Sequence, residues 1–508
     1  MPAIGAAVAA AAGALSGGAS AIAGALAAAG AFAAANVGTV LAVAAFAITA
    51  LTKKEPEVPF SAAAARRIQT FREPIVPRRS VYGEVRASGP ILYLNATGDN
   101  NRYFHLVVAL AGHQVEEIGD FYIDDDLVPL DDDGNATGHF AGHVRVRKHL
   151  GLPDQSADPD LVAESNNWTV DHRLLGIAYL YVRLKYNSNL FTAGVPNMSA
   201  IVKGKRVYDP RIQDTIYSTN PALCILDYMT DTQLGLGIPL KRINTATVIA
   251  SANICDESIQ HADGSSSARY TSDGTWTTDT SPEEILSQLK SSMAGDIIKA
   301  SGQWFIHAGA YRTPTIHYDE SDLTGPLKVS PKLSRRESAN GVKGVYTDPH
   351  NEWQPTDYPP IQNETYLAED HGRELFKEVD LPYTTDAATA QYIANVELEK
   401  SRRQLRVSLL VNLRGLLVQA GDTCFVSNAR LGWDRKVFEV TNHRFTRENK
   451  DGAPVLSVEL SLRETDAAIY QSLGEQTVIL DPTPTTNVPN TVSIPDEPPP
   501  EPDPQPAV

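Results

Sequence analysis

The chain has 508 residues and a formal net charge of −17, from 44 basic and 61 acidic side chains. Hydrophobic residues make up 42% and charged residues 21%, which excludes a wholly disordered or collagen-like chain. The excess of acidic residues argues against a protein that binds nucleic acid tightly through the phosphate backbone, because such binding needs clustered Lys and Arg. It does not exclude a surface past which nucleic acid slides. None of the three cysteines has CxxC spacing, so zinc-ribbon and redox motifs are absent from the sequence.

The first fifty residues differ from the rest of the chain. They contain 24 Ala, 7 Gly and no charged side chain, and as a helix they are long enough for two bilayer crossings. We predict an apolar helical segment over residues 1–52 and a linker over 53–77. The segment could be a membrane anchor, a plug packed inside an assembly, or a plug that is later delivered into a membrane. The side chains that we expect to face a membrane or a channel are Leu26, Phe32, Leu41, Phe46 and Ile48.

Strand signals dominate the first part of the body. Residues 80–85, 90–95, 118–123 and 176–185 are rich in β-forming residues, and a largely apolar run over 104–111 is typical of a buried strand. These patterns predict a first β-rich domain over residues 78–215.

Helix start signals appear further along the chain. Asn220-Pro221 and Ser281-Pro282 each place a capping residue before a proline, which is favoured in the first turn. We predict a mixed α/β domain over 216–375, then a helix near 387–404 followed by a β-domain, the two together spanning 376–470. The fold class is thus mainly β with interspersed helices (α+β).

The end of the chain has a composition of its own. Residues 481–508 hold ten Pro and five acidic residues but no basic one, which predicts an extended or disordered segment. We assign residues 471–508 to a Pro-rich acidic tail.

The sequence lacks the common catalytic and nucleotide-binding motifs. The motifs GxSxG, HExxH, GxGxxG and the P-loop are absent, so we predict no catalytic, cofactor-binding or metal-binding residues and no enzyme activity. Asp131, Asp133 and Asn135 match the first three ligand positions of an EF-hand loop. However, the glycine stands at 134 instead of 136, and Gly142 replaces the terminal glutamate. A turn between two strands explains this run better.

One loop stands out by its side chains. Residues 351–360 read Asn-Glu-Trp-Gln-Pro-Thr-Asp-Tyr-Pro-Pro, with two large aromatic residues and three prolines. Such a loop is more often a packing or assembly contact than a catalytic one. We predict an ordered assembly loop in which Trp353 and Tyr358 make the contacts.

Several sequence blocks, in this order, resemble a known family. The blocks are Tyr82-Gly-Glu-Val-Arg-Ala-Ser-Gly-Pro-Ile91, Leu110-Ala-Gly-His-Gln-Val-Glu-Glu-Ile-Gly119, Val202-Lys-Gly-Lys-Arg-Val-Tyr-Asp-Pro-Arg211, Asn220-Pro-Ala-Leu223 and Asn340-Gly-Val-Lys-Gly344. Together with the tryptophan loop they are similar to the tail-tip proteins of long-tailed, non-contractile phages, of which the lambda-type tip attachment (host specificity) protein is the type. The resemblance covers about residues 75–470, and this chain looks like a short form.

The resemblance implies a structural virion protein at the distal tip of the tail, made in the bacterial host cytoplasm. It implies a homotrimer that closes the tail tube and takes part in host attachment and DNA ejection. The implied partners are the hub, distal tail, tape-measure and tail-fibre proteins and the host envelope. Phage DNA would pass through without specific binding. Long members of the family continue into receptor-binding domains, whereas this chain stops after its acidic tail, and the resemblance leaves open whether this chain or a separate fibre binds the receptor.

An alternative of a different class stays open at this point. The chain could be a membrane-anchored bacterial envelope protein with an N-terminal helical hairpin. In that case Lys53 and Lys54 would be the positive charges that flank the hairpin.

Overall fold

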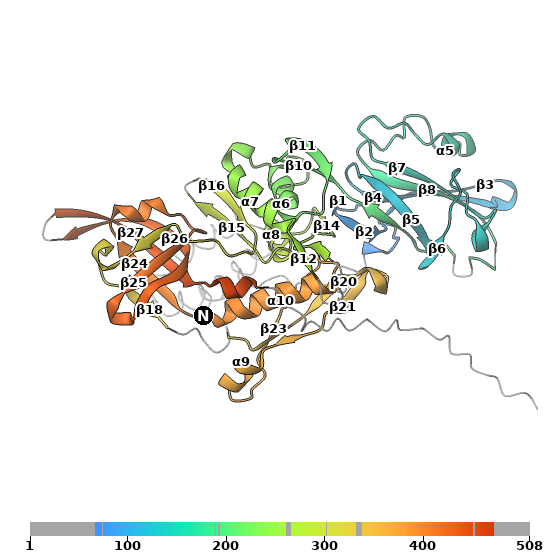
Figure 1. Ribbon diagram of the computed structural model, residues 1–508. Coiled ribbons are helices and arrows are strands. Elements are labelled where there is room, and N and C mark those ends of the chain that lie inside the picture. The colour runs from blue at the N-terminus through green and yellow to red at the C-terminus, as the bar shows by residue number, and fades with distance from the viewer. Residues whose placement is uncertain are drawn as a thin grey trace, which may run out of the picture. The chain divides into compact units, whose positions relative to one another are not determined.

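The computed structural model describes residues 67–471, apart from residues 74, 188, 192–193, 261–265, 301, 332–337 and 451–452. The chain divides into two units, Met1–Pro59 and Phe60–Val508, and every described residue belongs to the second. The predicted apolar segment and almost all of the acidic tail therefore lie outside the described residues. The described part is mainly β with interspersed helices, which confirms the predicted fold class (Figure 1).

Within the described residues, the first region is a sandwich of two four-stranded sheets, ordered β2-β9-β5-β6 and β3-β4-β8-β7. Alternate side chains of these strands, among them Val85, Leu106, Phe121 and Leu180, fill the space between the sheets. The strands are β2 (Glu84–Ala87), β3 (Ile91–Thr97), β4 (Tyr103–Ala111), β5 (Glu117–Ile123), β6 (Asp126–Val128), β7 (Val144–Leu150), β8 (Ala178–Lys185) and β9 (Met198–Lys203).

Strand β4 is apolar on both faces because both faces are covered. Leu106 and Val108 point into the sandwich, whereas Val107 packs with Leu161 and Trp168 in a second, smaller cluster. Leu161 comes from helix α5 (Pro159–Glu164). This arrangement explains the apolar run over 104–111 that predicts a buried strand.

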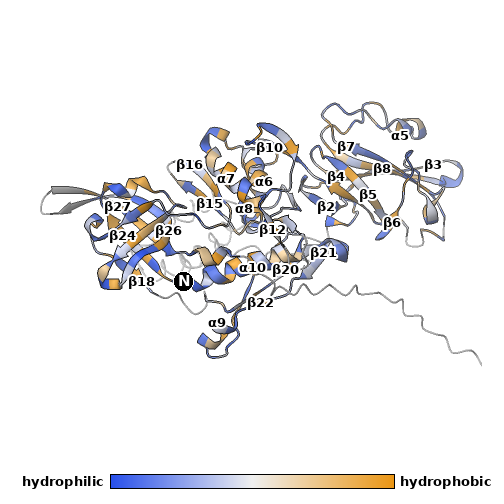
Figure 2. Ribbon diagram, viewed as in Figure 1, coloured by the Kyte–Doolittle hydropathy of each residue, from blue (hydrophilic) through white to orange (hydrophobic). Residues whose placement is uncertain are grey.

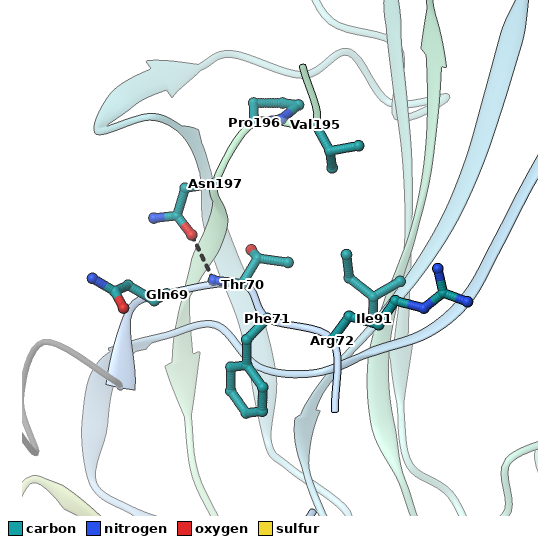
Figure 3. A pocket seen from close by; sticks show the side chains of 8 residues that line it. All are labelled: Gln69, Thr70, Phe71, Arg72, Ile91, Val195, Pro196 and Asn197. Carbon is teal, nitrogen blue, oxygen red and sulfur yellow. Dashed lines mark hydrogen bonds between the residues drawn. The ribbon is translucent and has the colours of Figure 1, made fainter. Parts of the chain in front are cut away.

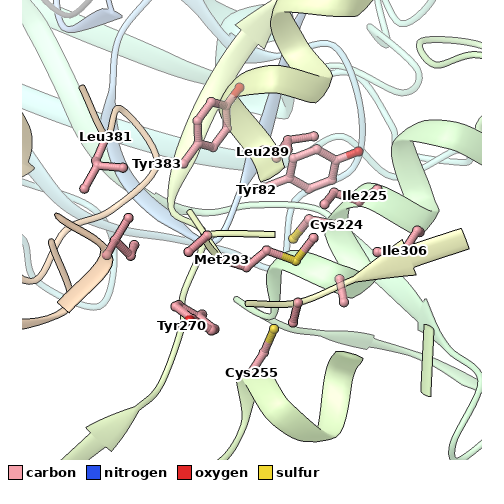
Figure 4. Packing of buried hydrophobic residues seen from close by; sticks show 14 of the residues in the cluster. Tyr82, Cys224, Ile225, Cys255, Tyr270, Leu289, Met293, Ile306, Leu381 and Tyr383 are labelled. Atoms are coloured by element: carbon pink, nitrogen blue, oxygen red, sulfur yellow. The ribbon is translucent and has the colours of Figure 1, made fainter. Parts of the chain in front are cut away.

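The central region packs helices and short strands around the largest apolar cluster, part of which Figure 4 shows. The predicted caps are present: Asn220 accepts a hydrogen bond from Ala222 N–H, and Ser281 accepts one from Glu284 N–H. The helices are α6 (Pro221–Thr230), α7 (Thr245–Cys255), α8 (Pro282–Ser291), α9 (Glu364–Glu369) and α10 (Ala387–Arg402).

The strands of the central region form short pairs and one three-stranded sheet, β22-β19-β23. They are β1 (Arg79–Tyr82), β10 (Arg206–Asp209), β11 (Asp214–Tyr217), β12 (Ser258–Gln260), β13 (Ser266–Ala268), β14 (Gly274–Thr277), β15 (Asp296–Ala300), β16 (Gln303–His307), β19 (Gly341–Lys343), β20 (Val345–Asp348), β21 (Gln354–Asp357), β22 (Ile361–Gln362) and β23 (Phe376–Glu378).

The last sheet in the part of the chain that the structure describes has six strands, in the order β17-β25-β26-β27-β24-β18. It surrounds its own apolar cluster, whereas the buried side of α10 belongs to the central cluster. Two of its strands precede α10 in the sequence, and the domain boundaries at 215, 375 and 470 stay predictions. The strands are β17 (Ile316–Tyr318), β18 (Lys328–Ser330), β24 (Arg406–Val411), β25 (Thr423–Asn428), β26 (Trp433–Lys450) and β27 (Ala453–Glu464).

Figure 2 shows apolar residues concentrated in the strands and in α6 and α7, while polar residues predominate in the loops. Among the helices that the structure describes, none has the length and apolar character that a bilayer crossing requires.

Candidate functional site

The sandwich and the central region share one stretch of chain. Strand β1 pairs with β14 of the central region, and β2, which follows after a single residue, pairs with β9 of the sandwich. That single residue is Gly83, with a φ of 64°. A Cβ atom at this position would lie 2.2 Å from Asp273 Oδ1, so only glycine fits the bend. We call the residues gathered around this bend the joint.

A cluster of charges holds one side of the joint. Lys205 Nζ lies 2.7 Å from Asp227 Oδ2 and 2.5 Å from Asp231 Oδ2. The hydroxyl of Tyr82 donates a 2.7 Å hydrogen bond to the same Asp227 oxygen. Burial lowers the pKa of Lys205, but its two carboxylate partners raise it overall. The lysine is therefore charged and pairs with two half-buried carboxylates, one in α6 and one at its C-terminus.

A buried carboxylate holds the other side of the joint. Asp273 is 6% exposed; its Oδ1 accepts from Glu84 N–H at 2.9 Å and its Oδ2 from Thr385 Oγ1 at 3.0 Å. The backbone N–H of Asp273 donates to the carbonyl of Tyr383. Burial raises the pKa of Asp273 to about 6, against the opposing effect of these hydrogen bonds.

A neutral histidine completes the joint. His113 Nε2 accepts a 2.9 Å hydrogen bond from Val81 N–H, and its Nδ1 lies 2.7 Å from the carbonyl of Gln114. Burial lowers the pKa of His113 to about 4. An imidazole that accepts at Nε2 must be neutral, so Nδ1 carries the proton and donates it to Gln114.

A second cluster of charges connects the central region with the six-stranded sheet. Glu439 of β26 accepts from Arg463 of β27 at 2.7 Å and from Arg312 at 3.0 Å. Burial raises the pKa of Glu439, but the two arginines lower it overall, so the carboxylate is ionised. Beside it, burial and Arg312 lower the pKa of His307 to about 4.

The tryptophan loop is packed inside the chain. Trp353 is 9% exposed and belongs to the sandwich core, whereas Tyr358 is 1% exposed and belongs to the central core. The carbonyl of Trp353 accepts a 2.6 Å hydrogen bond from Arg67, and the hydroxyl of Tyr358 donates to the carbonyl of Val379. The loop thus ties the two regions together, and its role as an assembly contact stays a prediction.

The other predicted site residues, Leu26, Phe32, Leu41, Phe46 and Ile48, lie outside the described residues. The run from Asp131 to Asn135 forms the predicted turn, because Asn135 N–H donates to Asp131 Oδ1 and Gly134 has a φ of 69°. Among the described residues, no group of three or more His, Cys, Asp or Glu side chains could hold a metal ion.

Figure 3 shows a pocket of about 440 Å³ beside the sandwich. Within it, Thr70 N–H donates a 2.6 Å hydrogen bond to Asn197 Oδ1. Arg72 is the single ionisable side chain among the described residues that line it, so the pocket offers no acid–base pair. The lining residues are Gln69, Thr70, Phe71, Arg72, Ile91, Val195, Pro196 and Asn197.

The two clusters and the loop are suited to holding structural regions in a fixed orientation. Their ionised groups are paired and largely shielded from water, and their histidines are neutral. No sequence motif pointed to Asp227, Asp273 or Glu439. Three of the blocks that carry the family resemblance do meet at the joint, however, because Tyr82, His113 and Lys205 each belong to a different block.

Comparison with known proteins agrees with a structural role. The chain is 25% identical over 442 residues to the baseplate hub protein pb3 of Escherichia phage T5. The match covers 73% of this chain and 46% of the phage protein, so the chain spans about half the length of the curated relative. These similarities support a structural protein of a phage tail. No family model matches the sequence.

One solved structure contains a chain with a similar fold. A chain in the virion of a native gene transfer agent particle superimposes with a TM-score of 0.57 and 14% identity, covering 80% of this chain and 89% of that one. This likeness shows that the two chains share a fold. A 43 kDa tail protein of prophage MuSo2 from Shewanella oneidensis matches with a TM-score of 0.31 and 11% identity, over 78% of this chain and 99% of that one.

Proposed function

We propose that this chain is the hub protein at the distal tip of a bacteriophage tail. In this proposal it forms a homotrimer that closes the tail tube and takes part in host attachment and DNA ejection. The observation that carries the proposal is the similarity to the phage T5 baseplate hub protein, which extends over 73% of the chain. The role is structural and needs no catalysis.

The charge of the chain is compatible with a passage for DNA. With 61 acidic and 44 basic residues, a wall built from this protein repels the phosphate backbone, and a duplex does not stick to it. DNA would thus pass through the trimer without specific binding. The partners in this proposal are the other tail proteins: the distal tail protein, the tape-measure protein, further hub components and the tail fibres.

The apolar residues 1–52 complete the proposal. They would plug the tube before infection and enter the host envelope when the tube opens. A segment made of Ala and Gly is only weakly hydrophobic, which suits a helix that is first packed in a protein channel and later inserted in a bilayer.

Microscopy of intact particles tests the location. Antibodies raised against residues 78–470 should label the distal tip of the tail in negative-stain images, and pre-immune serum should not. Labelling of the capsid or along the tail shaft would contradict the proposal. If the chain expressed without other phage genes stayed in carbonate-washed membranes as a monomer, the membrane-anchored alternative would be correct instead.

A further inference from the structure

Lys205 lies between two carboxylates at the joint, in an arrangement suited to a covalent reaction. Its Nζ atom is 2.7 Å from Asp227 Oδ2 and 2.5 Å from Asp231 Oδ2. The three side chains are 14–19% exposed, so they are shielded from bulk water while a small leaving molecule can still escape. An amine, a carboxyl group for it to attack and a second carboxylate to carry a proton are the groups that amide formation between side chains requires.

Asp231 lies in the position of the carboxyl group that is attacked. Its Oδ1 accepts hydrogen bonds from Gln233 N–H at 2.7 Å and from Leu234 N–H at 3.2 Å. Two backbone donors on one oxygen stabilise the negative charge that develops there when a nucleophile adds to the carbon. The other oxygen, Oδ2, faces Lys205 and is therefore the one that can leave as water.

Asp227 lies in the position of the proton carrier. Its Oδ2 contacts Lys205 Nζ at 2.7 Å and also accepts a 2.7 Å hydrogen bond from the hydroxyl of Tyr82. Burial raises the pKa of Asp227, although Lys205 opposes this effect. Burial also acts to raise the pKa of Asp231, but hydrogen bonds from Lys205 and from backbone N–H groups lower it overall. Asp227 is therefore the stronger base of the two.

We propose that Lys205 and Asp231 join through an amide bond, with Asp227 as the proton carrier. The charged lysine first transfers a proton to Oδ2 of Asp231, which leaves a neutral amine beside a carboxylic acid. The amine lone pair then forms the Nζ–Cγ bond, and the carbonyl electrons move to Oδ1. Asp227 takes a proton from the nitrogen and gives it to the Oδ2 hydroxyl. The Cγ–Oδ2 bond breaks, the carbonyl re-forms and one water molecule leaves.

The folded chain supplies the driving force for this condensation. Amide formation between separate molecules in water is opposed by the excess of water, but well-oriented groups within one molecule reach effective concentrations of about 10⁵ M or more. Lys205 follows β9 of the sandwich, and Asp231 follows α6 of the central region. The amide would therefore link the two regions covalently at the joint. This inference goes beyond the proposed function and does not depend on it.

Mass spectrometry of the full-length chain tests the proposal. After unfolding in denaturant, the wild-type protein should be lighter by one water molecule than its sequence requires. Trypsin does not cleave after an acylated lysine, so the digest should contain residues 204–206 joined to residues 212–241. Lys205→Arg should have its full mass, because a guanidinium does not acylate under these conditions. Asp227→Asn should also lose the cross-link, because an amide cannot carry the proton.

A second ion pair in the same chain is the matched control. Lys203 Nζ lies 2.6 Å from Glu117 Oε2, but these side chains are 39% and 54% exposed. Peptides that contain Lys203 should therefore stay linear in the wild-type digest. Full mass and a linear Lys205 peptide in wild-type protein, even after days at 37 °C, would overturn the proposal whether or not the variants fold. A cross-link from Lys205 to Asp227 would overturn the roles assigned to the two carboxylates. Near-ultraviolet circular dichroism checks the folding of the variants.

Discussion

The carboxylate of Asp273 links two other segments of the chain. One oxygen accepts a hydrogen bond from the backbone N–H of Glu84, and the other accepts one from the hydroxyl of Thr385. In water such a group has a pKa near 3.8, whereas burial in the joint raises it to about 6. The folded chain therefore holds this proton more tightly than the unfolded chain does. By linkage, this group contributes most stability below about pH 4, and that contribution is lost as the pH rises to about 6.

Asp273→Asn should remove this pH dependence, because an amide stays neutral and still accepts from Glu84 N–H. We expect the unfolding free energy of the variant, relative to wild type, to rise by about 1 kcal/mol per pH unit between roughly pH 4 and 6 and then level off. Urea unfolding across this range measures it. Asp279→Asn, on an exposed side chain after β14, is the control and should follow the wild type. A constant difference between Asp273→Asn and wild type would contradict the assignment.

At the scale of helices and strands, the N-cap side chains of α6 and α8 stabilise the helices that they begin. Asn220 not only caps α6 but also donates from Nδ2 to the carbonyl of Ala252 and to Asp256 Oδ1, both at the end of α7. It is 2% exposed, so water cannot replace these bonds. Ser281 caps α8 at an exposed position and bonds only within its own helix.

These two caps provide a matched pair of substitutions. Ser281→Ala should cost about 1 kcal/mol, the usual value of an N-cap. Asn220→Ala should cost about 2–3 kcal/mol, because it also leaves a buried carbonyl of α7 without its donor. Thermal and urea unfolding of both variants measure the costs. Equal costs would show that the bonds between α6 and α7 add nothing to the cap.

At the scale of the whole molecule, the proposed function depends on joining an uncharged segment to an acidic, β-rich body. The body holds its regions together through buried charges and the tryptophan loop. The first fifty residues contain no charged side chain, so a single carboxylate placed there is a large perturbation. On insertion scales, a charged residue at the centre of a membrane helix costs about 3 kcal/mol.

Phe46→Asp therefore tests entry into the host membrane. Particles that carry it should assemble normally and adsorb to cells but eject their DNA poorly, as measured by potassium efflux and by plating efficiency. Asn36→Asp adds the same charge at a position that is already polar and should be tolerated far better. Normal infectivity of the Phe46→Asp particles would rule out membrane entry while leaving the hub assignment intact.

Local signals in the sequence were sufficient to predict several of the helices and strands. Asn220-Pro221 and Ser281-Pro282 mark helices because a cap and a first-turn proline act within a few residues, and the apolar run over 104–111 marks a strand covered on both faces. The fold class follows from the same local patterns. Composition also determined that residues 1–52 differ from the body.

Only the tertiary structure decided how the regions are joined. The contacts of Lys205, Asp273 and Glu439 span long sequence separations, and a charged residue gives no local sign that it will be buried beside a partner. The same holds for Trp353, whose carbonyl bonds to Arg67 across 286 positions. Pairing between distant residues depends on how the chain folds back on itself, and that information is absent from any short window of sequence.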